Sequence, residues 1–264
     1  MSPTRAGAEE AATLAEGLEA LSLRDEGVLL TLAACGDDAV TLSLRPLDHG
    51  SGETQLLFDE AMCAHRVEND PNNSHPERPE RVTAVRDALI TNGLAAHCVR
   101  RVPGRLATRA EVALVHESTH WDRIEHAVSL EVNALAKFVS QHESIYLNAA
   151  SLDAASRAAG AVLDLADAVV SGRAKNGMAL VRPPGHHAEA HAAMGFCVFN
   201  TVAIAAQYAR SQLGCARVLV VDWDIHHGNG IQHIFEDDPD VLYFSAHRYT
   251  SNPLTLLTSS LLTI

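Results

Sequence analysis

Long apolar runs, positive charge and closely spaced cysteines are all scarce in this sequence. No apolar run reaches the roughly 20 residues of a membrane-crossing helix, which argues against a spanning segment. The net charge of −13 at pH 7 argues against a nucleic-acid-binding surface and suits a basic substrate such as a lysine-rich tail. Residues 1–26 are acidic and lack both a signal-peptide core and an arginine-rich transit pattern.

The five cysteines are spread along the chain without close pairs. This spacing predicts a reducing compartment, no structural disulfides and no cysteine-ligated metal. The residues concerned are Cys35, Cys63, Cys98, Cys197 and Cys215.

The stretch from Val218 to Gly230 carries the strongest functional pattern, Val-Leu-Val-Val-Asp-Trp-Asp-Ile-His-His-Gly-Asn-Gly. Its short apolar start predicts a buried parallel strand. Asp222, Asp224 and His226 follow at alternate positions, so their side chains share one side while the chain stays extended. They fall at the carboxyl end of the strand, where open parallel sheets bind ligands. A polar loop with internally hydrogen-bonded histidines is the alternative.

A second histidine cluster lies upstream in Arg182-Pro-Pro-Gly-His-His-Ala-Glu. It follows the apolar run Met178 to Val181, which predicts another buried strand. Prolines fix the backbone angle φ and Gly185 permits a turn, so we expect the backbone to hold His186 and His187 rigidly. Adjacent imidazoles on a rigid turn suit proton transfer, because histidine titrates near neutral pH.

Strands and helices alternate along the rest of the chain, as expected for one α/β domain. Further strands are predicted at 27–33 and 39–44, joined as a hairpin, and at 55–58 and 97–102. Helices are predicted at 76–93, 108–116, 151–171 and 200–214. We expect His65 and His75 to be surface loop histidines.

Together these segments resemble the zinc-dependent histone deacetylases, and within them class II. The matching segments are RPPGHHAEAHAAMGFCVFN, VDWDIHHGNG and VLYFSAHRY, preceded by HPERPERV and SIYLNAASLDAASRAAG. The similarity runs from about Leu56 to Tyr249, and Asn229 stands where class I members usually carry Asp. The resemblance implies a three-layer α/β fold with a mainly parallel sheet of the arginase/deacetylase type.

The resemblance also implies zinc-dependent hydrolysis of acetyl-lysine. Asp224 and His226 match two zinc ligands. His187 matches the general base and later general acid, with His186 as its electrostatic partner.

Two further residues match the groups that orient these histidines. Asp222 would orient His186, and Asn229 would orient His187 through a neutral amide. An amide in place of a carboxylate should stabilise the imidazolium less.

Gly195 and Phe196 match the acyl-lysine tunnel of the resembled family, although plain core packing is the alternative for Phe196. A monovalent cation site for potassium also carries over from the resemblance, and all-oxygen coordination fits such a hard cation. Its matching residues are Asp222, Asp224, His226, Ser245 and Ala246.

The resemblance stops after Tyr249, where the family continues to a third metal-binding aspartate and a tyrosine that polarises the carbonyl. The tail at 250–264 has neither charge nor histidine, and a catalytic zinc normally has three protein ligands. We therefore interpret the chain as the amino-terminal part of a deacetylase whose carboxyl-terminal strands are absent. The expected parts are an extension at 1–54, a partial catalytic domain at 55–249 and a non-family tail at 250–264.

The expected function is protein lysine deacetylation, with the activity of this truncated chain left open. The alternatives are an acetylpolyamine or non-histone deacylase of the same fold, and a non-catalytic binding or regulatory fragment. The resemblance implies an acetylated histone tail as substrate, a corepressor complex as partner, and a nuclear or cytoplasmic location. Direct binding to DNA or to a membrane is not expected.

In the resembled fold, the strands at 178–181 and 218–221 are separated by two strands from the carboxyl half. We therefore expect an open slot in the sheet, with unpaired backbone groups on both sides. Either the leucine-rich segment 254–264 fills this slot, or the two strands pair with each other.

Overall fold

The computed structural model describes the backbone of residues 28–32 and 101 and, in full, residues 53–68, 70, 72, 74–100 and 105–248. Its strands are β1 Val28–Leu32, β2 Thr54–Phe58, β3 Cys98–Arg101, β4 Asn176–Leu180, β5 Val218–Asp222 and β6 Val241–Ser245. Its α-helices are α2 Glu80–Thr91, α3 Arg109–Val112, α4 Ser118–Val128, α5 Val132–Val139, α6 Ser151–Val170, α7 Thr201–Leu213 and α8 Asn229–Phe235. Two 3-10 helices complete the set, η1 Glu60–Ala64 and η2 Leu94–His97.

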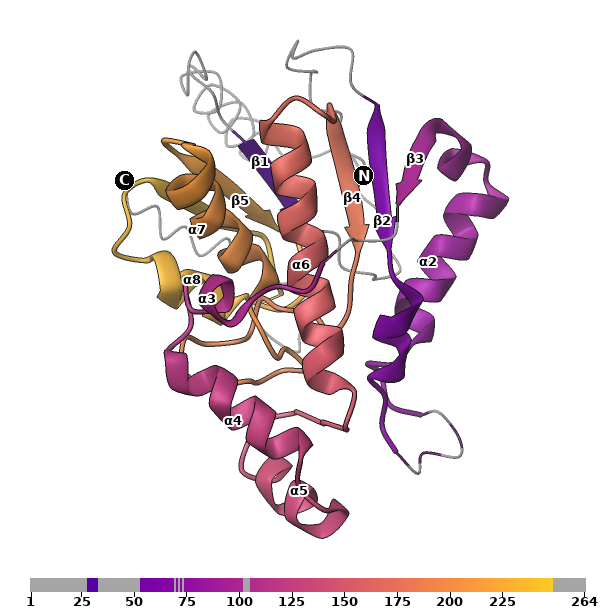
Figure 1. The fold of residues 1–264 in the computed structure, drawn as a ribbon, viewed down its shortest axis with the longest axis vertical. Helices are drawn as coiled ribbons and strands as arrows, with labels where there is room; N and C mark the ends of the chain where they lie inside the picture. The colour runs from indigo at the N-terminus through magenta and orange to yellow at the C-terminus, as the bar shows by residue number, and fades with distance from the viewer. Residues whose placement is uncertain are drawn as a thin grey trace, which may run out of the picture.

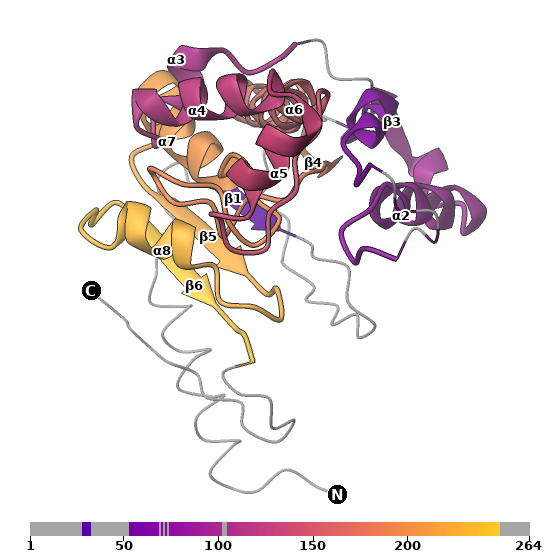
Figure 2. The ribbon, with the colours of Figure 1, turned by 90° about the horizontal axis from the view of Figure 1, so that it is seen from below.

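The described strands form two parallel sheets, with the orders β1-β5-β6 and β3-β2-β4 (Figures 1 and 2). Val218 at the start of β5 pairs with Val28 on one side and with Val241 on the other. In the second sheet, Thr54 of β2 pairs with Cys98 and with Asn176. Every pairing between these strands is parallel, which confirms the predicted α/β class.

The strand β1 occupies the side of β5 that faces away from β6. One of the two alternatives, pairing between the strands of the two histidine motifs, is therefore wrong, because β5 pairs with β1 and β6 while β4 pairs with β2. The strand predicted at 27–33 is present as β1. Its expected hairpin partner at 39–44 and the segment 254–264 lie outside the described residues.

The strand β4 is more exposed than its apolar sequence predicts. Met178 is 41% exposed, and only Leu180 at the end of the strand is buried. Within the described residues β4 has a hydrogen-bonded neighbour on one side, so its other edge is uncovered. The strand β5 is paired on both sides and alternates between buried and half-buried residues.

Helices α6 and α7 lie side by side on one face of the strands (Figures 1 and 2). Helix α6 packs on β4 and helix α7 on β5, so the pair bridges the two sheets. A glycine lets the segment before α3 approach α6 closely: a Cβ atom at Gly160 would lie 2.3 Å from the carbonyl oxygen of Arg105. The main core cluster joins α6 to α7 through Ala155, Ala159, Leu163, Ile204 and Ala205.

Helix ends follow the local sequence. Thr108 and Glu111 form the predicted capping box of α3, although that helix ends at Val112 and does not continue to residue 116. The side chain of Asn200 caps α7 by accepting from the backbone N–H of Ala203. None of the helices in the described part of the chain is long and apolar enough to cross a membrane.

Candidate active site

The two histidine motifs meet just beyond the carboxyl ends of β4 and β5. His186 Nδ1 donates a hydrogen bond of 3.0 Å to Asp222 Oδ2, across 36 positions of sequence. Asp222 is fully buried, and its carboxylate also accepts from the hydroxyl of Tyr243 at 2.9 Å and from the backbone N–H of Asp224 at 3.0 Å. Three donors therefore surround this carboxylate.

Opposing effects act on the pKa of Asp222. Burial raises this pKa. The hydrogen bond and electrostatic interaction with His186, together with the hydrogen bonds from Asp224 and Tyr243, lower it by more than burial raises it. The net pKa of Asp222 is therefore below its usual range. Asp222 is therefore ionised at neutral pH. An ionised carboxylate at Nδ1 keeps that nitrogen of His186 protonated, as the sequence predicts.

The second dyad joins His187 to Asn229, the first residue of α8. His187 Nδ1 lies 2.7 Å from Asn229 Oδ1. The rings of His186 and His187 have centroids 4.0 Å apart. Burial lowers the pKa of His187, and the neighbouring His186 lowers it further. A neutral imidazole at neutral pH is the form that can accept a proton.

Glycines let these segments approach each other. A Cβ atom at Gly228 would lie 2.4 Å from Asp222 Oδ2, and one at Gly230 would lie 2.2 Å from the carbonyl oxygen of Ala188. Gly195 has φ +55°, and a Cβ there would lie 2.5 Å from the ring of His187. The loops on both sides of the dyads thus contact them through glycine backbone.

Asp224 and His226 lie together beyond β5 but not along an extended strand. The strand ends at Asp222, and each aspartate then accepts from the backbone N–H two residues on, at 3.0 Å for Asp224 and 2.8 Å for His226. Such Asx-type turns replace the strand, so the predicted period of two does not hold here. His226 Nδ1 lies 3.0 Å from Asp224 Oδ1, and its side chain is 70% exposed.

The described residues contain no group of three or more His, Cys, Asp or Glu side chains able to hold a metal ion. Asp224 and His226 are thus adjacent oxygen and nitrogen donors without a third partner among these residues. His186 Nε2 lies 4.0 Å from Asp224 Oδ1, which places this pair beside the first dyad. Two donors match part of a zinc site and fall short of the usual three.

The predicted potassium residues gather around the end of β5. The backbone N–H of Ala246 donates to the carbonyl of Asp222 at 2.9 Å, while the hydroxyl of Ser245 bonds to His247 Nδ1 at 2.8 Å. Both oxygens of the Asp222 side chain already accept bonds from protein donors. Potassium binding by this group stays a prediction.

The predicted tunnel residues lie against the second dyad. Gly195 contacts the ring of His187 as described, and Phe196 has a positive φ of 70°. The ring of Phe196 meets that of His75 edge-on at 5.1 Å. Phe196 is half-buried and lies outside the core clusters, whereas Phe199 is 1% exposed and belongs to the core. Core packing therefore describes Phe199 and not Phe196.

A buried network next to this site involves residues for which no role in the site was predicted. Arg182, Glu77 and His65 are each 1% exposed, and Arg182 Nη2 donates to Glu77 Oε2 at 2.7 Å. The ring of His65 stacks on Tyr146 with centroids 4.4 Å apart. The expectation of a surface His65 is therefore wrong: burial and the Arg182 charge lower its pKa to about 3. The sequence signals for this network were the charged residue directly after an apolar strand and the family-like segments HPERPERV and SIYLNAASLDAASRAAG, which contain Glu77 and Tyr146.

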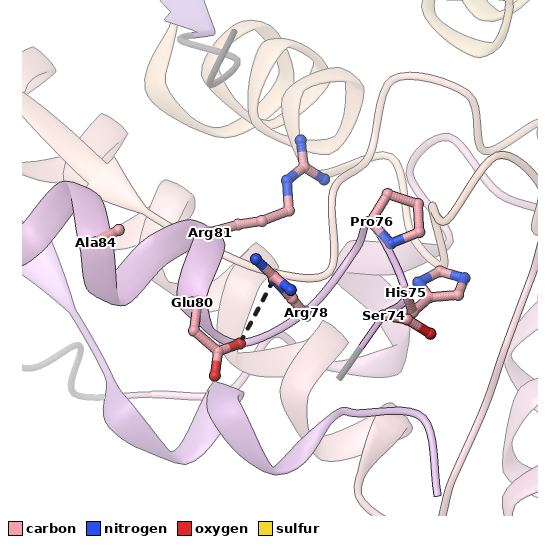
Figure 3. Close-up of a pocket in the computed structure, with 7 residues that line it drawn as sticks. All are labelled: Ser74, His75, Pro76, Arg78, Glu80, Arg81 and Ala84. Carbon is pink, nitrogen blue, oxygen red and sulfur yellow. Dashed lines mark ion pairs between the residues drawn. The ribbon is translucent and has the colours of Figure 1, made fainter. Parts of the chain in front are cut away.

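A separate hollow of about 450 Å³ lies at the start of α2 (Figure 3). Its ion pair joins Arg78 Nε to Glu80 Oε2 at 4.0 Å. The lining contains none of the predicted site residues, although His75, which borders it, also contacts Phe196. The lining residues are Ser74, His75, Pro76, Arg78, Glu80, Arg81 and Ala84.

Comparison with known proteins shows the family to which the chain is similar. The profile of the Histone deacetylase domain family matches residues 75–255. The human protein named Polyamine deacetylase HDAC10 is 48% identical over 196 residues, which cover 74% of this chain and 29% of that protein. Histone deacetylase 15 of Arabidopsis thaliana is 43% identical over 199 residues, covering 75% of this chain and 35% of that protein.

A crystal structure of the HDA15 HD domain superposes with a TM-score of 0.66 at 42% identity, covering 74% of this chain and 53% of that chain. Paired imidazoles beyond the strand ends of a parallel α/β fold have the side-chain chemistry that acid–base catalysis uses. The chain belongs to the histone deacetylase family, whose members are hydrolases, and it is class II-like. It spans only 29% and 35% of the length of the two curated relatives named above.

Proposed function

We propose that this chain supplies the acid–base half of a deacetylase site that hydrolyses acetyl-lysine in proteins such as histone tails. One observation carries the proposal: two adjacent imidazoles are each bonded through Nδ1 to an oxygen from the other motif, at 3.0 and 2.7 Å. Bonding through Nδ1 leaves the Nε2 atom of each ring for the reaction.

His187 acts first as base and then as acid in this proposal. Its Nε2 takes a proton from a water molecule whose oxygen forms a bond to the acetyl carbon. The carbon–nitrogen bond then breaks, and Nε2 returns the proton to the departing lysine amine. His186, oriented by the ionised Asp222, is the electrostatic partner of this base.

Zinc belongs to the proposal only as a cofactor of a more complete site. Asp224 and His226 would supply two of the three protein ligands that a catalytic zinc normally has, so the third has to come from outside the described residues. A bound zinc ion would polarise the acyl carbonyl. We propose potassium as a second, structural ion near Asp222, Ser245 and Ala246.

Metal analysis tests the zinc part directly. The chain is loaded with zinc, dialysed and analysed for bound metal, and we expect well under one zinc ion per chain because two ligands bind weakly. The Asp224→Ala variant should retain still less. Stoichiometric zinc that survives dialysis and is lost in Asp224→Ala would show that a third ligand lies in the residues not described.

An acetylpolyamine is the second candidate substrate, because the human relative described above is named as a polyamine deacetylase and is 48% identical. The net charge of −13 suits a cationic substrate of either kind. We further propose an acetylated protein tail and a corepressor complex as partners in the nucleus or cytoplasm, without direct contact with DNA or membrane.

The decisive assay compares two substrates with added zinc: an acetyl-lysine peptide and an acetylated spermidine. Turnover of the peptide that His187→Ala abolishes would support the main proposal, whereas preference for the spermidine would support the second candidate. Glu125→Ala, at an exposed position of α4, is the matched control and should keep full turnover. Absence of turnover with both substrates would favour a non-catalytic binding or regulatory role for this chain.

A further inference from the structure

The amide of Asn229 lies between the proposed base and a second acidic residue, Glu189. Asn229 Oδ1 faces His187 Nδ1 at 2.7 Å, while Asn229 Nδ2 donates to Glu189 Oε1 at 2.5 Å. The Glu189 side chain is 14% exposed. His187, Asn229 and Glu189 thus form a continuous hydrogen-bonded series.

An amide cannot by itself decide which tautomer of a histidine it faces. If its oxygen points at Nδ1, that nitrogen must carry the hydrogen; if its NH₂ group points there, Nδ1 must be the acceptor and Nε2 carries the hydrogen. A carboxylate at the same position would remove this ambiguity, because an ionised carboxylate only accepts. Asn229 therefore needs a partner that selects one orientation.

Glu189 has the chemistry of that partner. Its ionised carboxylate accepts hydrogen bonds and cannot donate them, so the NH₂ group of Asn229 has to face it. The amide oxygen then faces His187, whose Nδ1 must carry the hydrogen. Nε2 is left with its lone pair. The other acceptors near Asn229 Nδ2 are weaker, namely Met194 Sδ and the carbonyl of His187, both at 3.4 Å.

The surroundings hold Glu189 in position. The backbone N–H of Glu189 donates to Ala192 at 2.9 Å, and its carbonyl accepts from His116 Nδ1 at 2.9 Å. On the solvent side, His233 Nδ1 lies 2.9 Å from Glu189 Oε1, and its side chain is 52% exposed. The start of α8 packs closely against the segment that carries Glu189, because Gly230 contacts the carbonyl of Ala188.

We propose that Glu189 is a positioning residue that fixes the amide orientation of Asn229 and, through it, the Nδ1–H tautomer of His187. The role of this tautomer in hydrolysis rests on the proposed function, whereas the tautomer itself does not. The carboxylate of Glu189 thus supplies, through the amide of Asn229, the tautomer selection that a carboxylate at position 229 would provide directly.

The test reads the tautomer by ¹⁵N NMR of the histidine rings in the full chain at pH 8, with His187 assigned through its absence in His187→Gln. In the unaltered chain we expect a single species with the hydrogen on Nδ1. Glu189→Met keeps the volume but removes the acceptor, so we expect a mixture of both tautomers. Glu189→Gln places a second amide there, which can turn either its oxygen or its NH₂ group toward Asn229, so we expect a mixture in this variant as well.

The Asn229→Asp/Glu189→Met double variant distinguishes the effect of the amide orientation at position 229 from the effect of side-chain packing at position 189. A carboxylate at position 229 accepts without help, so the Nδ1–H species should return although Glu189 is absent. His233→Ala is the control for the solvent-side bond and should leave the tautomer unchanged. If Glu189→Met does not fold, Glu189→Ala replaces it with the same expectation.

A single Nδ1–H species in a folded Glu189→Met or Glu189→Ala variant would overturn the proposal. This readout needs no turnover, so an inactive chain with the expected tautomers would count against the proposed function alone. In an active chain, Glu189→Met should lower kcat with little change in KM, because the orientation of the base and not substrate binding is affected.

Discussion

Arg182 and Glu77 lie 105 positions apart in the chain and form a two-point ion pair that is almost completely buried. Arg182 Nε donates to Glu77 Oε1 at 3.0 Å, and Nη2 donates to Oε2 at 2.7 Å. Nη1 of the same guanidinium bonds to the carbonyls of Met62 and His65. One side chain thus ties η1 and the segment before α2 to the turn that carries His186.

We predict that Arg182→Met strongly destabilises the fold, because it leaves the Glu77 carboxylate buried without its positively charged partner. The expected loss in the free energy of unfolding is about 3–5 kcal/mol. The matched control is Arg109→Met, which removes an ion pair to Asp122 whose side chains are 49% and 50% exposed. That loss should be at most about 1 kcal/mol, and equal losses in urea denaturation would contradict the prediction.

Gly195 and Gly214 offer a matched pair of glycine substitutions. Both have positive φ, +55° and +76°, but only a Cβ at Gly195 meets a side chain, the ring of His187. Each change to alanine should cost about 1–2 kcal/mol from the backbone conformation. Only Gly195→Ala should also shift the NMR signals of the His187 ring and reduce any turnover. An unchanged His187 ring in a folded Gly195→Ala variant would show that the loop moves aside.

The pairing of β1 with β5 predicts that proline within β1 destabilises the sheet beside the site. Alternate N–H groups of a paired strand point to its neighbour, so proline at Leu29 and at Leu30 should have unequal effects. The stronger variant should lose about 1–3 kcal/mol through a lost bond and an unpaired carbonyl. Hydrogen exchange across Val218–Asp222 is the measurement, and unchanged protection in both variants would refute the pairing.

His116 gives the fold a dependence on pH. Its Nδ1 donates to the carbonyl of Glu189 and its Nε2 accepts from the backbone N–H of Asn200, both at 2.9 Å, so only the neutral ring fits. Burial, followed by the charge of the adjacent His120, lowers its pKa to about 3. In the unfolded chain the pKa of this histidine is about 6.5. As the pH falls below that value, His116 becomes protonated in the unfolded chain before it does so in the folded chain.

The contribution of His116 to stability is therefore complete above about pH 6.5 and is lost as the pH falls toward about 3. For each such histidine, the free energy of unfolding falls by at most about 1.4 kcal/mol for every unit by which the pH is lowered in this window. Urea midpoints measured between pH 7.5 and 5 should fall less steeply for His116→Gln than for the unaltered chain. Parallel curves would contradict the assignment. A residual slope is expected, because the pKa of His65 is also lowered to about 3.

Local sequence determined the features that depend on neighbouring residues. The capping box at Thr108, the Asn200 cap and the strand leading to Asp222 follow from side chains within a few positions of each other. Backbone propensity, capping geometry and residue spacing are encoded locally, so these features follow from the sequence alone. The pairing of His186 with Asp222 and of His187 with Asn229 spans 36 and 42 positions, and it was predicted only through the family resemblance.

Tertiary structure alone decided the contacts between distant segments. Nothing in the pattern of residues 28–32 specifies β5 as their neighbour, because an apolar strand fits any uncovered parallel edge. The burial of His65 depends on Arg182, 117 positions away, and the contact of Glu189 with Asn229 depends on a close approach at Gly230. Sequence determined which groups are able to donate, accept or ligate, and the packing of helices and strands decided which of them meet.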